Sequence, residues 1–228
     1  MRLFNGDNKV VSIAGYKNDV LFPEIEAVSA YWEGLRMGRL VPQRSEIDPR
    51  GIDRALANTF ILDRIAPGLA RIRLTGSHLN DLLGMEVRGM PFTALLTPAS
   101  RQQMCTALEA VFDGPQTATI TLTAERRLGK PPMDAKLVLL PLRSDLGEIT
   151  RIMGCFVAHG AIGRTPRRFD VVDVKMTALT SVKRSNENSP KDADIVPSVS
   201  GKKTEDLKTK PTKPSAVILR LVTPNEQL

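Results

Sequence analysis

The stretch Arg71-Ile-Arg-Leu-Thr-Gly-Ser-His-Leu-Asn-Asp-Leu-Leu-Gly-Met-Glu-Val-Arg-Gly89 decides the fold. Apolar side chains alternate with arginines over Arg71–Leu74, which predicts a strand with one wet face. Ser77 predicts the cap of a short helix whose leucines point inward, and Gly84 suits the left-handed residue just past its end. A strand that leads directly into a short helix is therefore the centre of the predicted domain.

The segments before this stretch predict a hairpin and two helices. Phe60–Ile65 and Leu69–Thr75 flank Pro67-Gly68, which is a hairpin signal. Upstream, Val20–Gly38 predicts an amphipathic helix, because apolar residues recur at steps of three and four. Its apolar face consists of Ile25, Val28, Trp32 and Leu35. Asp48-Pro49 predicts the start of a second, short helix, with an acidic cap and proline in the first turn.

The segments after the stretch predict one regular helix and three strands. Thr97-Pro98 begins a helix that Gly114-Pro115 ends, and its apolar residues fall on one face. The three predicted strands are Gln116–Glu125, Asp134–Arg143 and Ile149–His159. Together with the hairpin they predict an α+β fold, a five-stranded antiparallel sheet with helices on one face, preceded by the amphipathic helix.

Composition divides the chain into two regimes. Residues 1–165 carry 20 Lys and Arg, of which 16 are Arg, whereas residues 166–228 carry 12, of which 8 are Lys. We therefore expect an N-terminal segment at 1–19, a folded domain at 20–165 and a disordered basic tail at 166–228, in which 171–182 could form an isolated strand. The apolar island 216–222 has two readings, transient structure or a short docking segment that adds a strand to a partner sheet.

The order of these elements between Phe60 and His159 resembles a PAS domain, and the quoted stretch carries the match. The chain is similar to a bacterial family of short proteins with a single PAS domain and no attached output module, in which a Trp-x-x-Leu-Arg helix precedes the domain. The residues that fit this family are Trp32, Leu35, Arg36, Arg39, Pro42, Arg71, Gly76, Ser77, Gly84, Glu86, Arg88 and Gly89.

The resemblance implies signal sensing or regulated protein contact. It also implies a cavity between the sheet and the helices. The candidates to line it are Phe92, Met104, Leu108, Ile120, Leu139 and Phe156. The alternative reading is that these six side chains simply form the core, as they do in most such domains.

Cofactors and metals are disfavoured by the residues available. Haem needs an axial ligand beside the pocket, but the only histidines are His78 at a helix start and His159 at a strand end. Flavin is disfavoured as well, since Cys105 lies mid-helix rather than in the Asn-Cys-Arg setting of flavin photoreceptors. The two cysteines form no CxxC pair, which predicts no metal site.

The residues give only weak support to catalysis or to nucleic-acid binding. His78 and Asp81 are three residues apart and could form an acid/base pair on a helix, but no nucleophile stands at a suggestive spacing, so we assign no catalytic residue. Acidic residues are interspersed among the tail lysines, which dilutes the field that phosphates would feel. No segment reaches the ~18 consecutive apolar residues of a membrane span, and Met1–Lys17 lacks a leader pattern, which predicts a cytoplasmic protein.

The leading hypothesis is a non-enzymatic sensory or regulatory protein that acts through protein contact, gated by a small ligand. The rivals are a small-molecule-binding or hydrolytic enzyme on an α+β cone fold, with His78 and Asp81 at work, and nucleic-acid binding through the basic tail. The apolar face of the first helix could pack on its own sheet or pair with a second copy, and we expect a homodimer through that helix.

Overall fold

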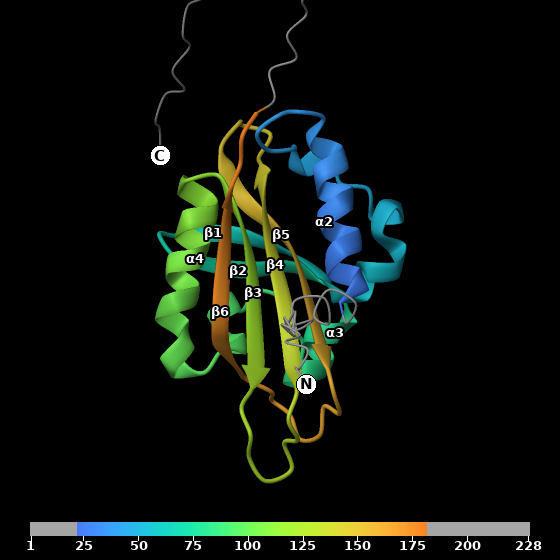
Figure 1. Ribbon diagram of the computed structural model, residues 1–228, viewed down its shortest axis with the longest axis vertical. Coiled ribbons are helices and arrows are strands. Elements are labelled where there is room, and N and C mark those ends of the chain that lie inside the picture. Colours follow the sequence, from blue (N-terminus) through green and yellow to red (C-terminus); the bar gives the residue numbers. More distant parts are fainter. Residues whose placement is uncertain (1–21, 182–228) are drawn as a thin grey trace, which may run out of the picture. The chain divides into compact units, whose positions relative to one another are not determined.

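The computed structural model describes residues 22–181 (Figure 1). The N-terminal segment 1–19, the docking segment 216–222 and the tail from residue 182 lie outside the described residues. Within them, no helix is long and apolar enough to cross a membrane.

Along the described residues, three helices precede two strands, and four more helices precede four strands; several of the helices are 3-10 helices. The helices are α2 (Pro23–Arg36), η1 (Arg44–Glu46), η2 (Pro49–Asn58), α3 (Ser77–Leu83), η3 (Phe92–Leu95), η4 (Pro98–Ser100) and α4 (Arg101–Asp113). The strands are β1 (Thr59–Ala66), β2 (Leu69–Thr75), β3 (Gln116–Ala124), β4 (Asp134–Arg143), β5 (Ile149–His159) and β6 (Phe169–Ala178). The predicted α+β class is confirmed.

The sheet has the order β2-β1-β5-β4-β3-β6, with antiparallel neighbours throughout. It therefore contains one strand more than predicted. The segment 171–182, read as an isolated strand in the tail, instead contributes most of β6, which pairs with β3 from Phe169↔Ala124 to Ala178↔Gln116. The folded sheet thus continues past the predicted domain end at residue 165.

The inner face of the sheet is covered by α3, η3 and α4. Its buried side chains form one cluster that includes Phe60 and Leu62 of β1, Ile120 of β3 and Phe156 of β5. A Cβ at Gly154 would lie 2.2 Å from the Phe60 ring, so only glycine leaves room for that ring. This face is a closed apolar core.

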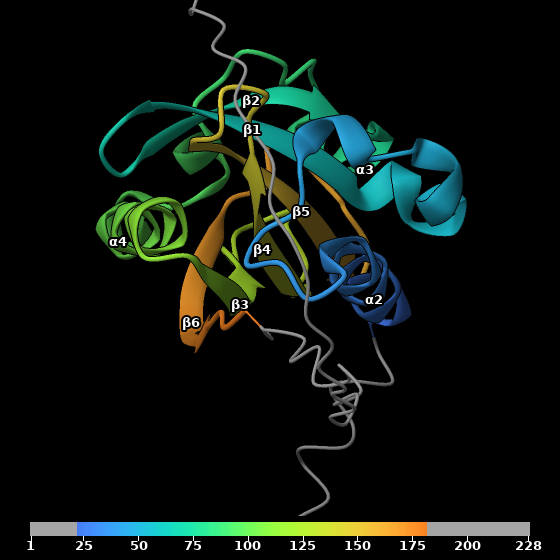
Figure 2. The same cartoon turned by 90° about the horizontal axis from the view of Figure 1, so that it is seen from above.

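The outer face carries α2 and η2, on the side of the sheet away from α4 (Figure 2). Ile25, Val28 and Trp32 are at most 2% exposed and pack with Val138 and Met153 of the sheet. Of the two readings of this apolar face, the structure shows packing on the chain's own sheet. A homodimer through the helix stays a prediction.

Candidate functional site

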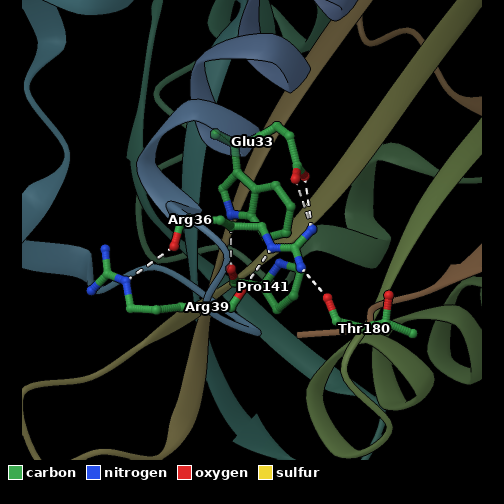
Figure 3. A network of polar contacts seen from close by, with 6 residues as sticks. Glu33, Arg36, Arg39, Pro141 and Thr180 are labelled. Atoms are coloured by element: carbon green, nitrogen blue, oxygen red, sulfur yellow. Dashed lines mark hydrogen bonds and ion pairs between the residues drawn. The ribbon is translucent and has the colours of Figure 1, made fainter. Parts of the chain in front are cut away.

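The C-terminal end of α2 is held by one buried arginine (Figure 3). The Arg36 guanidinium donates to both carboxylate oxygens of Glu33, at 3.0 and 2.8 Å, to the Arg39 carbonyl at 2.9 Å and to the Thr180 carbonyl at 2.6 Å. Its carbon Cζ lies 5.4 Å from the centre of the Trp32 ring. Arg36 thus connects the helix, the loop that follows it and the chain just beyond β6.

Neighbouring residues of the same motif complete this clamp. The Trp32 indole N–H donates to the Pro141 carbonyl of β4 at 3.0 Å. Arg39 donates to the Leu35 carbonyl at 2.7 Å and to the Glu46 carboxylate at 2.8 and 2.9 Å. The hydrogen bond from the Gln43 backbone N–H lowers the pKa of Glu46, and Arg39 adds to the effect.

The Pro42 carbonyl accepts from the backbone N–H of Arg143 at the end of β4, at 2.9 Å. The Trp-x-x-Leu-Arg motif, with Arg39 and Pro42, is therefore a set of hydrogen bonds that fixes the end of α2 on the sheet. The sequence indicates these residues through the family resemblance, and acidic neighbours of the arginines predict pairing within the molecule, as Arg36–Glu33 and Arg39–Glu46 show.

A groove runs beside α2 over the outer face of β3 and β6. It consists of two adjoining hollows of about 490 and 850 Å³ that share the residues Glu26, Ser29, Thr119 and Thr177. α2 packs on β4 and β5, which leaves the outer side of the next two strands uncovered. We call this uncovered strip the α2 groove.

The floor of the α2 groove is polar because of the alternation in β3. Apolar residues of this strand point to the inner core, so its threonines point outward, among them Thr119 and Thr121. Charged side chains stand on the rim, including Glu33 on α2 and Asp173 and Lys175 on β6. Hydroxyl groups and mixed charges suit hydrogen bonding to a polar partner surface.

The six candidate pocket residues come together on the opposite, inner face. Phe92, Met104, Leu108, Ile120, Leu139 and Phe156 all belong to the inner core cluster and are at most 1% exposed. None of them lines either hollow of the α2 groove. Phe92 stacks on Phe60 with ring centres 5.0 Å apart, and Phe156 meets the edge of Phe169 at 5.0 Å. A role for the six residues in ligand binding stays a prediction.

The remaining motif residues have backbone roles. A Cβ at Gly76 would lie 2.3 Å from the carbonyl oxygens of Leu56 and Ala57, which explains the glycine there. Gly76, not Ser77, occupies the cap position of α3, and no side chain caps that helix. Gly84 and Gly89 have φ values of +70° and +83°, where side chains are strained.

The charged motif residues lie at the surface. Arg71 lies 4.0 Å from the Asp63 carboxylate, and Arg88 lies 3.9 Å from that of Glu86 with both side chains largely exposed. Pairs of this kind contribute only ~0–1 kcal/mol to stability.

His78 faces the sheet rather than a catalytic partner. Its Nε2 accepts from the backbone N–H of Ala158 at 3.2 Å, so this nitrogen carries no proton in the folded state. Burial lowers the pKa of His78, although Asp81 and Glu24 act in the opposite direction. The hydrogen bond gives the ring a structural position at the end of β5.

Neither cysteine stands in an activating environment. Cys155 is buried under α2, and this burial raises the pKa of its thiol to about 12. A thiol with so high a pKa is a poor nucleophile near neutral pH. Cys105 lies half-buried on α4. Among residues 22–181, no group of three or more His, Cys, Asp or Glu side chains could hold a metal ion.

Comparison with known proteins decides the family. A family model described as PAS domain matches residues 22–157, more than half of the chain. The chain belongs to this PAS-domain family. No curated protein matches the chain.

Solved structures with a similar PAS fold are light-oxygen-voltage domains. One, from a study of a flavin analogue, is 18% identical with a TM-score of 0.39, over 49% of this chain and 83% of that one. An RNA-binding light-oxygen-voltage receptor is 22% identical with a TM-score of 0.36, over 52% of this chain but only 36% of its own. The light state of Aureochrome1 is 18% identical with a TM-score of 0.35, over 49% and 88%. Likeness at this level concerns the fold alone.

The expectation that flavin is disfavoured is wrong as it was argued. It rested on the mid-helix position of Cys105, yet the solved structures with a similar fold include light-oxygen-voltage domains, one of them studied with a flavin analogue. The cysteine setting concerns a photochemical reaction, whereas binding of a flat ring depends on the shape and lining of a cavity. The position of one cysteine therefore excludes no flavin.

Proposed function

We propose that this PAS domain is a non-enzymatic regulatory module that binds a partner protein in the α2 groove. The observation that carries the proposal is the uncovered outer strip of β3 and β6, bordered by a helix that is pinned at its end through Arg36. The family has a sensory fold, and this strip is hollowed beside α2.

The clamp supplies a physical route for regulation. Arg36 contacts α2, the loop after it and the Thr180 carbonyl beyond β6, so a partner that displaces β6 or α2 has to strain or break these hydrogen bonds. Conversely, any change that loosens the clamp alters the width of the α2 groove. This is a two-state element of the kind that couples binding to conformation.

Non-enzymatic action is part of the proposal and is supported by the groups described above. The Nε2 of His78 accepts a hydrogen bond from the backbone N–H of Ala158. The Cys155 thiol is buried and protonated. Replacing His78 with Ala tests the rival hydrolytic reading. The proposed regulator keeps its binding function in this variant, whereas a hydrolase would lose turnover.

Gating by a small ligand is a separate part of the proposal and needs its own measurement. Native mass spectrometry with an absorbance scan of the purified protein reports any retained molecule together with the oligomeric state. A molecule bound at one equivalent supports gating, and a mass equal to that of the bare chain, monomeric or dimeric, contradicts it.

A photo-crosslinking amino acid placed at Thr119, on the groove floor, tests the site of contact in cells. The matched control places the same amino acid at Thr106, which is exposed on α4 on the other side of the sheet. We expect discrete adducts from position 119 and none of the same mass from position 106.

The captured partner is then purified and its affinity measured by titration calorimetry. Thr119→Arg fills the groove floor and is expected to weaken binding by at least about tenfold. The same adducts from both positions, or an affinity unchanged by Thr119→Arg, would sink the proposed groove contact.

A further inference from the structure

A second hollow lies on the outer face, across α2 from the groove. It has a volume of about 320 Å³ and is bordered by η1, η2, β1, β2 and β5, whereas the α2 groove lies over β3, β4 and β6. The side chains that give this hollow its apolar lining are Ile47, Ile52, Leu56, Ile61, Leu74 and Met153. Two of them, Leu56 and Leu74, are each 44% exposed, so the apolar lining of the hollow continues to the surface. We call this feature the η2 hollow.

An unpaired arginine stands in the wall of the η2 hollow. Arg44 lines it, and the side chain of Arg44 forms no hydrogen bond or ion pair with any residue in 22–181. Its Nε is shielded from solvent and has no acceptor. A guanidinium that has no acceptor within the domain is suited to bind a carboxylate from a partner.

Three further arginines lie in a row beside the hollow. Ile61 pairs with Leu74 and Met153 across three strands, and all three side chains line the hollow. Two residues further along β1, Asp63 pairs with Arg71 on β2 and with Arg151 on β5. Residues two apart in a strand share a face about 7 Å apart, so this row borders the hollow directly.

The row is short of negative charge. Arg71, Arg73 and Arg151 lie 4.0, 3.9 and 3.3 Å from the single carboxylate of Asp63, and all three are 39% or more exposed. Three arginines thus share one carboxylate, an excess of two positive charges in the row, and Arg44 lies in the wall of the same hollow. The apolar hollow therefore has a basic border that the domain itself does not neutralise.

We propose that the η2 hollow and its arginine row form a docking site for an acidic segment of a partner protein, which inserts one bulky apolar side chain. The hollow receives the apolar anchor, while Arg44 and the row hold carboxylates on either side of it. Interface hot spots are anchors that fill a desolvated pocket, and complementary charges around them give specificity and faster association. This site is distinct from the α2 groove, and the proposal does not depend on it.

Selection of a random-peptide display library on the immobilised full chain tests the proposal. We expect the enriched peptides to combine Asp or Glu with a bulky apolar residue, and a labelled copy of the leading peptide to bind saturably by fluorescence anisotropy. Replacing its acidic residues with Lys, or its apolar anchor with Ser, is expected to weaken binding by at least about tenfold.

Two protein variants locate the contact. The double variant Arg71→Glu/Arg73→Glu is expected to weaken binding of the leading peptide by at least about tenfold. Arg126→Glu/Arg127→Glu changes the net charge equally, but on the exposed turn between β3 and β4, and is expected to keep the affinity within about twofold. Thermal unfolding of each variant confirms that the domain is still folded.

Three outcomes overturn the proposal. The first is an enriched set without acidic residues, or no enrichment. The second is equal weakening by the two double variants, which would show attraction by net charge alone. The third is a serine-substituted peptide that binds as well as the original, which would leave the hollow without a role.

Discussion

The two faces of the sheet are built in opposite ways. The inner face is closed by α3, η3 and α4, and its cluster extends over all six strands, with buried side chains that are at most 4% exposed. The outer face is covered by α2 and η2 alone, which leaves the α2 groove on one side of the helix and the η2 hollow on the other. Hydrogen bonds of Trp32 and Arg36 hold the C-terminal end of α2 on the sheet.

This difference indicates which face of the sheet stabilises the PAS domain and which face is available for binding. A closed apolar face contributes stability in proportion to the area removed from water, and it tolerates little change. The outer face is covered only in part by α2 and η2, so the side chains of its ordered strands remain available for binding. Truncating a side chain of the inner face should therefore lower the free energy of unfolding. Substituting a side chain of the outer face should first change the affinity for a partner.

The largest expected effect is on the inner face. Phe156→Ala removes a ring that is 1% exposed and packs on Phe169, which should lower the free energy of unfolding by about 3–5 kcal/mol. Urea unfolding followed by circular dichroism measures this. The matched truncation on the outer face, Thr121→Ala, should cost less than about 0.5 kcal/mol. Equal costs would remove the contrast between the faces.

The next effect concerns the segment that leads into β6. Arg167 is fully buried and donates to the carbonyls of Ile162 at 2.5 Å and Pro131 at 2.6 Å. Arg167→Met keeps the length of the side chain but leaves both carbonyls without this donor, so we expect a loss of about 2–4 kcal/mol.

The exposed neighbour of Arg167 provides the control for that measurement. Arg168→Met should change the free energy of unfolding by no more than about 0.5 kcal/mol in the same urea experiment. A comparable loss in both variants would mean that the buried hydrogen bonds of Arg167 are not what attaches β6.

A smaller effect is expected at the outer clamp. Arg36→Lys keeps the charge but cannot reach Glu33, Arg39 and Thr180 together, since an ammonium lacks the planar fork. We expect a loss of about 1–2 kcal/mol and faster hydrogen exchange at the end of α2. Arg39→Lys, at an exposed ion pair, should cost under about 1 kcal/mol. Unchanged exchange in Arg36→Lys would contradict the role of the clamp.

The smallest effect is a change in pH dependence. Burial lowers the pKa of His78 in the folded protein below its ordinary value of about 6.5, so the unfolded chain binds a proton at a higher pH than the folded one. The contribution of neutral His78 is complete above that unfolded pKa and is lost as the pH falls below it.

Urea unfolding between about pH 7.5 and about pH 5.5 tests this sign. We expect wild type to lose more stability than His78→Gln over that range, because glutamine can accept from Ala158 but does not titrate. A steeper or equal fall in the variant would contradict the assignment.

The sequence predicted helices and strands correctly where a segment buries one of its faces. The four-step spacing of Val28 and Trp32 and the alternation of Ile120 and Leu122 each predicted an element that the structure contains. Periodicity reveals such elements because burial on one side imposes it. The left-handed Gly84 was predicted correctly for the same local reason.

The missed features depend on partners far along the chain. β6 is only half-buried, so its residues show no strong alternation, and pairing with β3 some 50 residues away fixes it. Arg36 is a charged residue on a surface-like helix until Thr180 and Trp32 enclose it. Arg167 likewise carries no local sign that it is buried.

The chain's sequence alone determined the α+β class and the order of elements from the first helix to β5, since both follow from short-range periodicity and turn residues. The motif was known from its resemblance to the PAS family. Tertiary structure decided which face of the sheet α2 covers, that β6 joins the edge beside β3, and that the arginine of the motif is a clamp. These features arise from long-range pairing and from burial of charge, whose free energy depends on neighbours that no local window contains.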